Sequence, residues 1–153
     1  MYSFLIKNAT ILDGSGNKEC LGDIAINDNK IIAIAPVINS QAKTVIDAKN
    51  LVACPGFIDV QNHSDSYWQL FDNPGLQSIV SQGYTTVLIG QCGGSLAPLL
   101  SHEALLAFQK WHSMDGVNVN WQSFAECAEV LSQDKYGCNI ASLVGYGTLR
   151  RGI

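Results

Sequence analysis

The stretch PGFIDVQNHSD, from Pro55 to Asp65, decides which fold we expect for this chain. Its continuous apolar run GFIDV is typical of a strand in a parallel sheet that is covered on both faces. Because side chains alternate along a strand, Asp59, Gln61 and His63 are expected on one face near its carboxyl end. The carboxyl ends of parallel barrel strands are where active sites lie, so the stretch predicts a site at that edge.

The remainder of the chain after Pro55 alternates between helical and strand patterns. Strands that alternate with helices indicate βαβ units and therefore a parallel sheet. Caps at Asp72 or Asn73 and a stop at Gly83 delimit the first expected helix. No closing helix is expected after the last strand. The expected elements are a helix over 72–83, a strand over 84–90, helices over 101–114 and 121–133, and a strand over 138–147.

The first fifty residues show a different pattern. Short runs rich in apolar and β-branched residues, such as SFLIKN, ATILD and KIIAIA, predict about six short strands. The segment NDNK, Asn27 to Lys30, predicts a tight turn between two of them. Such a series indicates a small antiparallel β-unit over residues 1–54, and a second domain over residues 55–153.

Composition narrows the function classes. The chain has 153 residues, of which 47% are hydrophobic and 14% charged, so it can bury a core. A net charge of -4 gives no reason to expect nucleic-acid binding. No apolar run reaches the roughly 18 residues of a membrane span, and no signal peptide is visible, so we expect a cytoplasmic protein without a membrane partner. The five cysteines form no CxxC pair, and all except Cys92 are expected to be buried small hydrophobes.

Three segments carry a family resemblance through their order and spacing: VIDAKNLVACPGFIDVQNHSD, SQGYTTVLIGQCGGSLAP and NIASLVGYGTLRRG. The chain resembles the amino-terminal part of the N-acyl-D-amino-acid deacylases (D-aminoacylases) of the amidohydrolase superfamily. The motif GQCGGSLAP is specific to the deacylase branch, whereas the opening β-unit is generic to the superfamily. The resemblance implies a (β/α)₈ barrel whose zinc site hydrolyses the amide bond of N-acyl-D-amino acids.

A complete barrel needs about 250 residues, far more than follow Pro55. The resemblance therefore implies an α/β fold with two parts. A small amino-terminal β-sandwich-like unit of the composite-domain type covers residues 1–54. The first about three β/α units of an incomplete (β/α)₈ metal-dependent hydrolase barrel cover residues 55–153. The later strands, which in the family carry further histidine ligands and the catalytic aspartate, have no counterpart here, so no catalytic residue is assigned to this chain.

The resemblance assigns His63 and Cys92 to the metal site. Gln61 stands where the family has the first histidine of a His-x-His pair, and an amide is a poor zinc ligand, so this position is degenerate. Tyr146 stands where the family usually has histidine and is assigned to substrate binding. From the residues alone, His63 and Tyr146 also fit a barrel rim, and Cys92 fits a buried thiol before a glycine turn. Arg150 fits a surface residue better than a partner for a substrate carboxylate.

The remaining polar candidates have structural interpretations. His102 and His112 are expected at the surface of a helix, and Asp65 and Asp72 are expected to be loop or cap residues. With two of three family histidine positions substituted, zinc is expected to bind this chain weakly or not at all.

Three functional hypotheses stay open at this stage. The chain is an amidohydrolase whose remaining strands lie on a complementary chain, a truncated inactive relic, or a non-catalytic interaction module. In the first case its small-molecule partner is an N-acyl-D-amino acid. Whether the chain is an enzyme is left open, and on its own it is expected to be inactive.

Overall fold

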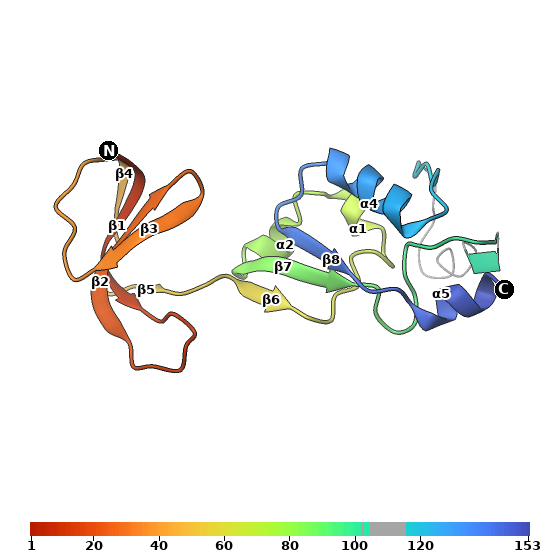
Figure 1. Cartoon of the computed structure of the whole chain (residues 1–153), viewed down its shortest axis with the longest axis horizontal. Helices are drawn as coiled ribbons and strands as arrows, with labels where there is room; N and C mark the ends of the chain where they lie inside the picture. The colour runs from red at the N-terminus through yellow and green to blue at the C-terminus, as the bar shows by residue number, and fades with distance from the viewer. Residues whose placement is uncertain (102, 105–115) are drawn as a thin grey trace. The chain divides into compact units, whose positions relative to one another are not determined.

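The computed structural model describes residues 1–101, 103–104 and 116–153 (Figure 1). They form two compact units, Met1–Pro55 and Gly56–Ile153. Most of the helix expected over 101–114, together with His102 and His112, lies outside the described residues.

The first unit is a five-stranded sheet in the order β3-β2-β1-β4, with β5 also paired to β1. A two-residue turn joins β2 to β3, with Asp28 and Asn29 at φ 47° and 62°. Left-handed backbone at both central positions is what a type I′ hairpin requires, so the turn predicted over Asn27–Lys30 is confirmed. The strands are β1 Tyr2–Ile11, β2 Cys20–Asn27, β3 Lys30–Ala35, β4 Ala42–Asp47 and β5 Val52–Ala53.

Two expectations for this unit were wrong. SFLIKN and the first three residues of ATILD lie in one strand, β1, whose register shifts between Ile6 and Ala9, where Asn8 takes a left-handed conformation. The unit is also not purely antiparallel, because β4 and β5 both pair with β1 in parallel. Both strands pair with β1 on the side away from β2, and the chain reaches that side only after passing from β3, at the other edge of the sheet.

The second unit contains three parallel strands, β6, β7 and β8, with β7 in the centre. The parallel sheet expected after Pro55 is therefore confirmed. The two outer strands are sheet edges in the described part of the unit, and Phe57 and Ile58 of β6 are 54% and 62% exposed, against the expectation of a strand covered on both faces. The strands are β6 Phe57–Asp59, β7 Tyr84–Ile89 and β8 Asn139–Ser142.

Short helices accompany this sheet (Figure 1). They are α1 Gln69–Asp72, α2 Gln77–Val80, α4 Phe124–Gln133 and α5 Tyr146–Arg151. The capping box at the start of α4 is complete, because Ser123 Oγ accepts the Glu126 N–H and the Glu126 carboxylate accepts the Ser123 N–H. No helix in the described part of the chain is both long enough and apolar enough to cross a membrane.

The helix expected over 72–83 is interrupted. Leu76 adopts φ 45° and lies 1% exposed in the core, so burying this side chain overrides the local helical pattern. Gly137 N–H also donates to the Pro74 carbonyl, which holds the interruption against the segment before β8. Only α1 and α2 remain as four-residue helices on either side.

The end of the chain differs from expectation too. The last strand stops at Ser142 and does not continue to Gly147. A helix that was not expected, α5, begins at Tyr146. The hydrophobic core of the unit contains Trp68, Leu70, Leu76, Val87, Ile89 and Trp121.

Candidate functional site

The loop after β6 begins with a turn built on Asp59. Its carboxylate accepts the Gln61 N–H at 3.1 Å and the Asn62 side-chain amide at 2.7 Å. Side-chain bonds of this kind compete with the strand and end it at Asp59. The expectation that Asp59, Gln61 and His63 share one strand face is therefore wrong, and Gln61 is exposed to solvent.

The loop after β7 is a tight glycine turn. Gly94 N–H donates to the Gln91 carbonyl at 3.1 Å, and the two residues between them, Cys92 and Gly93, have φ 55° and 80°. Gly90 precedes the turn at φ 81°, with its missing side chain against the Leu143 carbonyl. This backbone lifts the Cys92 thiol to the surface, so its alternative interpretation as a buried thiol is wrong.

The two loops bring His63 and Cys92 together. The His63 Nε2 atom lies 3.6 Å from the Cys92 Sγ atom, although 29 residues separate them in the chain. With Zn–S near 2.3 Å and Zn–N near 2.0–2.1 Å, two ligands of one tetrahedral zinc lie about 3.6 Å apart. An imidazole and a thiolate are both good zinc ligands. The pair therefore has the chemistry and the spacing of two positions of a zinc site.

The pair does not make a complete metal site. Among the described residues, no group of three or more His, Cys, Asp or Glu side chains is arranged to hold a metal ion. A catalytic zinc needs three protein ligands and a water, and a structural zinc needs four. Gln61 adds only an exposed neutral amide. The described residues thus fit half of a zinc site.

Asp65, which was expected to be a loop or cap residue, is fully buried at 0% exposure. Its carboxylate accepts the Gly90 N–H at 2.9 Å and the Ser66 N–H at 2.8 Å. Burial raises the pKa of the Asp65 carboxyl above its ordinary value, although the Gly90 and Ser66 N–H groups act in the opposite direction. Sequence reasoning missed this role, because the acceptor and its Gly90 donor lie 25 residues apart.

The amino-terminal end of α5 packs against the glycine turn. The Thr148 N–H donates to the Gly93 carbonyl at 3.1 Å, and the Ser95 N–H donates to the Thr148 hydroxyl at 2.9 Å. Both side chains are buried, Ser95 at 0% and Thr148 at 2% exposure. This polar contact fixes the start of α5 beside the Cys92 turn and was not foreseen from the sequence.

Tyr146 was expected at the end of a strand. In the structure it begins α5 instead and is 73% exposed. The backbone of Gly145 and Gly147 lies so close to the Gly93 carbonyl that a Cβ at either position would contact it. Tyr146 is therefore held near the glycine turn by its neighbours, while its own ring faces solvent. Arg150 is an exposed residue of α5, in agreement with its interpretation as a surface arginine.

The other cysteines divide into two groups. Cys127 and Cys138 are buried as expected, and burial raises the pKa of the Cys127 thiol to about 11. Cys20 and Cys54 are exposed, against expectation. Cys20 begins β2 and Cys54 follows the two-residue β5, so both lie at strand ends that the sheet does not cover.

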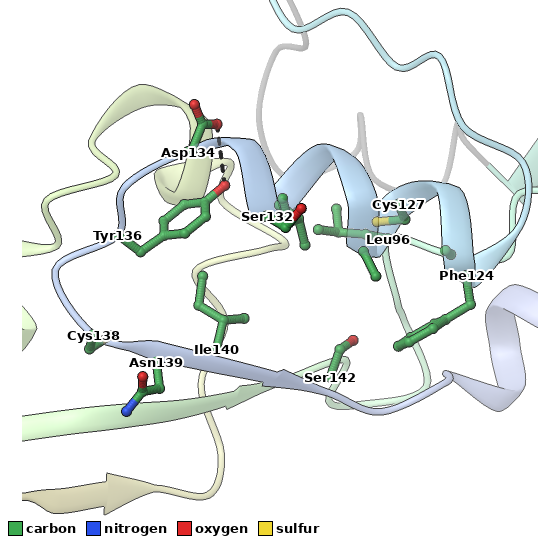
Figure 2. Close-up of a pocket in the computed structure, with 13 residues that line it drawn as sticks. Leu96, Phe124, Cys127, Ser132, Asp134, Tyr136, Cys138, Asn139, Ile140 and Ser142 are labelled. Atoms are coloured by element: carbon green, nitrogen blue, oxygen red, sulfur yellow. Dashed lines mark hydrogen bonds between the residues drawn. The ribbon is translucent and has the colours of Figure 1, made fainter. Parts of the chain in front are cut away.

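A separate cavity of about 390 Å³ lies between α4 and β8 (Figure 2). Leu131, Ile140 and Phe124 give it apolar walls, and Tyr136 donates its hydroxyl to Asp134 at 3.4 Å along one side. Burial and the nearby Asp134 raise the pKa of Tyr136 to about 12. None of the candidate residues, Asp65 included, lines this cavity, so it is distinct from the His63–Cys92 pair.

Comparisons with known proteins find relatives that match nearly the whole of this chain. No family model matches it. It is 35% identical over 147 residues to an N-acyl-D-aspartate deacylase of Alcaligenes xylosoxydans xylosoxydans, covering 96% of this chain and 29% of that protein. It is 32% identical over 152 residues to a D-aminoacylase of the same organism, covering 99% of this chain and 31% of the relative. The chain thus spans about three tenths of the length of these relatives.

Solved structures agree with the sequence comparisons. A D-aminoacylase studied for its binuclear metal centre superposes with a TM-score of 0.85 and 30% identity over 99% of this chain and 31% of that chain. An N-acyl-D-glutamate deacylase of Bordetella bronchiseptica, in complex with zinc and a phosphonate mimic of the tetrahedral intermediate, superposes with a TM-score of 0.82 at 30% identity. It is likewise covered to 31%, and this chain to 99%.

Proposed function

Since this chain is a relative of the N-acyl-D-amino-acid deacylases (D-aminoacylases) of the amidohydrolase superfamily, we propose that it supplies one part of a zinc-dependent hydrolase of N-acyl-D-amino acids. It contributes the amino-terminal β-unit and the first about three β/α units of a (β/α)₈ barrel. A complementary chain contributes the remaining strands. The assembled enzyme is cytoplasmic.

The spacing of His63 and Cys92 is the observation that carries this proposal. Their ligand atoms lie 3.6 Å apart at the carboxyl ends of two adjacent parallel strands, the edge at which barrel enzymes place their active sites. Zinc in such a site polarises the amide carbonyl and lowers the pKa of a bound water toward about 7. His63 and Cys92 hold the metal from this side, and the complementary chain supplies the missing ligands and the catalytic base.

The alternative is a truncated, inactive relic, and the exposed Gln61 in place of a ligand favours it. The two hypotheses differ in what happens when the rest of the barrel is supplied. A complementary reading frame next to the gene, beginning with a helix and a further strand, would support the split enzyme.

A chimera provides the direct test. The matching segment of the Alcaligenes D-aminoacylase is replaced by this chain, and release of D-amino acid from an N-acetyl-D-amino acid is measured. The unmodified D-aminoacylase is the positive control, and the isolated chain with added zinc is expected to be inactive. Chelator-sensitive activity in the chimera that Cys92→Ala abolishes is the expected result.

A second chimera carrying Gln61→His separates the alternatives. If only this variant is active, the scaffold is competent and Gln61 alone disables the site, as the relic hypothesis states. If neither chimera is active although both fold, the proposed role of this chain is wrong.

A further inference from the structure

We propose that Asp65 is a positioning residue whose buried carboxylate sets the distance between His63 and Cys92. Its significance for metal binding rests on the proposed function, but the geometric claim stands without a metal. Asp65 follows His63 by two residues, and its hydrogen-bond donor, the Gly90 N–H, precedes Cys92 by two residues. One side chain thus connects the two loops that present the pair.

The loops need such a connection because the strand pairing ends below them. Pairing of β6 with β7 stops at Asp59 opposite Val87. Among the described residues, the last backbone hydrogen bond between the two segments runs from the Asn62 N–H to the Leu88 carbonyl at 3.1 Å. On the exposed side, the Gln91 side chain adds a bond to the Val60 carbonyl at 2.8 Å. Beyond these, the Asp65 carboxylate is the buried link.

Each end of this link is rigid. Asp65 is 0% exposed, and its Oδ1 atom is held by the Ser66 N–H at 2.8 Å and the Ser66 hydroxyl at 3.3 Å. At the other end, Gly90 is buried, and a Cβ added to it would overlap the Leu143 carbonyl just after β8, so the backbone is closely packed there. A hydrogen bond to a carboxylate is shorter and stronger than one between neutral groups. This bond therefore holds the two loops at a fixed separation.

Asp23 provides a matched control in the other unit. It is 2% exposed and also accepts two backbone N–H groups, those of Asn8 and Ile38, each at 2.9 Å. Replacing either aspartate removes a buried carboxylate that ties two segments together. Only the replacement of Asp65 is expected to change the separation of His63 and Cys92.

The experiment measures this separation without a metal. In the full chain with Cys20→Ser and Cys54→Ser, His63→Cys places a second thiol opposite Cys92. A cysteine side chain is shorter than an imidazole, so the thiols are bridged with dibromobimane, which becomes strongly fluorescent only after both its arms have reacted. The bridging rate of this parent is compared with that of the same protein carrying Asp65→Ala, Asp65→Asn or Asp23→Asn.

We expect Asp65→Ala to lower the bridging rate about tenfold, the equivalent of about 1.4 kcal/mol, within the range for leaving a buried N–H unpaired. Asp65→Asn keeps the shape and one acceptor but turns an amide N–H toward Ser66, so an intermediate rate is expected. It also decides the question if Asp65→Ala does not fold. Asp23→Asn is expected to bridge at the parent rate.

Three results would overturn the proposal. If the parent protein does not react with both arms of the reagent, residues 63 and 92 do not lie close together in solution. If the Asp65 variants bridge at the parent rate, Asp65 has no positioning role. If Asp23→Asn slows bridging as much as the Asp65 variants do, the slowing reflects a general destabilisation of the protein. The activity of the chimera tests the proposed function separately, while the bridging rates alone decide the role of Asp65.

Discussion

Gly90→Ala is expected to destabilise the second unit through two separable effects. Gly90 has φ 81°, and placing an alanine in left-handed backbone costs about 1 kcal/mol. A Cβ at this position would also overlap the Leu143 carbonyl oxygen, while the Leu143 N–H is held by the Ile89 carbonyl at 3.0 Å. Overpacking of this kind costs about 1–3 kcal/mol more, for a total of about 2–4 kcal/mol.

Gly116→Ala isolates the first effect. Gly116 has φ 87°, but a Cβ added there would meet nothing within 4 Å, so only the backbone strain of about 1 kcal/mol applies. Urea unfolding followed by tryptophan fluorescence is the assay, since Trp68 and Trp121 belong to the second unit and residues 1–55 contain no tryptophan. Equal losses of unfolding free energy in Gly90→Ala and Gly116→Ala would refute the close packing of Gly90 against Leu143.

Further outcomes are expected for metal binding, association and pH. After dialysis, metal analysis should find well below one zinc per chain, and Gln61→His should raise the content only modestly; near-stoichiometric zinc that disappears in Cys92→Ser would contradict this. Sedimentation should show self-association, because Ile34 and Ile46 are 50% and 45% exposed on one face of the first sheet. The variant Ile34→Lys should weaken this association. A monodisperse monomer would show that these exposed side chains do not drive association. Hydrogen bonds from Ser123 and Gln122 lower the pKa of Glu126 below its ordinary 4.5, so the α4 cap is complete above that pH and is lost as pH falls through the lowered value. Circular dichroism should therefore show α4 fraying in acid, and Glu126→Gln should remove the pH dependence.

Local pattern predicted much of the molecule. The Asn27–Lys30 turn, the strand over 84–90 and the helix over 121–133 each depend on contacts within a few residues, and the structure contains all three. The family resemblance rests on short motifs of the same kind. His63 and Cys92 were singled out from those motifs, and the structure brings their side chains within 3.6 Å.

Tertiary structure decided the features that join distant segments. Leu76 breaks a well-patterned helix because the core takes its side chain, and β4 pairs in parallel with β1, which is not its neighbour in sequence. Asp65 reads as an ordinary loop aspartate until the Gly90 N–H, 25 residues away, is found against its carboxylate. Periodicity and capping signals describe a residue's neighbours in the chain, whereas burial and long-range hydrogen bonds depend on which segments fold against each other. For that reason the sequence motifs singled out His63 and Cys92, whereas the fold alone decided how the two are held and that Asp65 connects their loops.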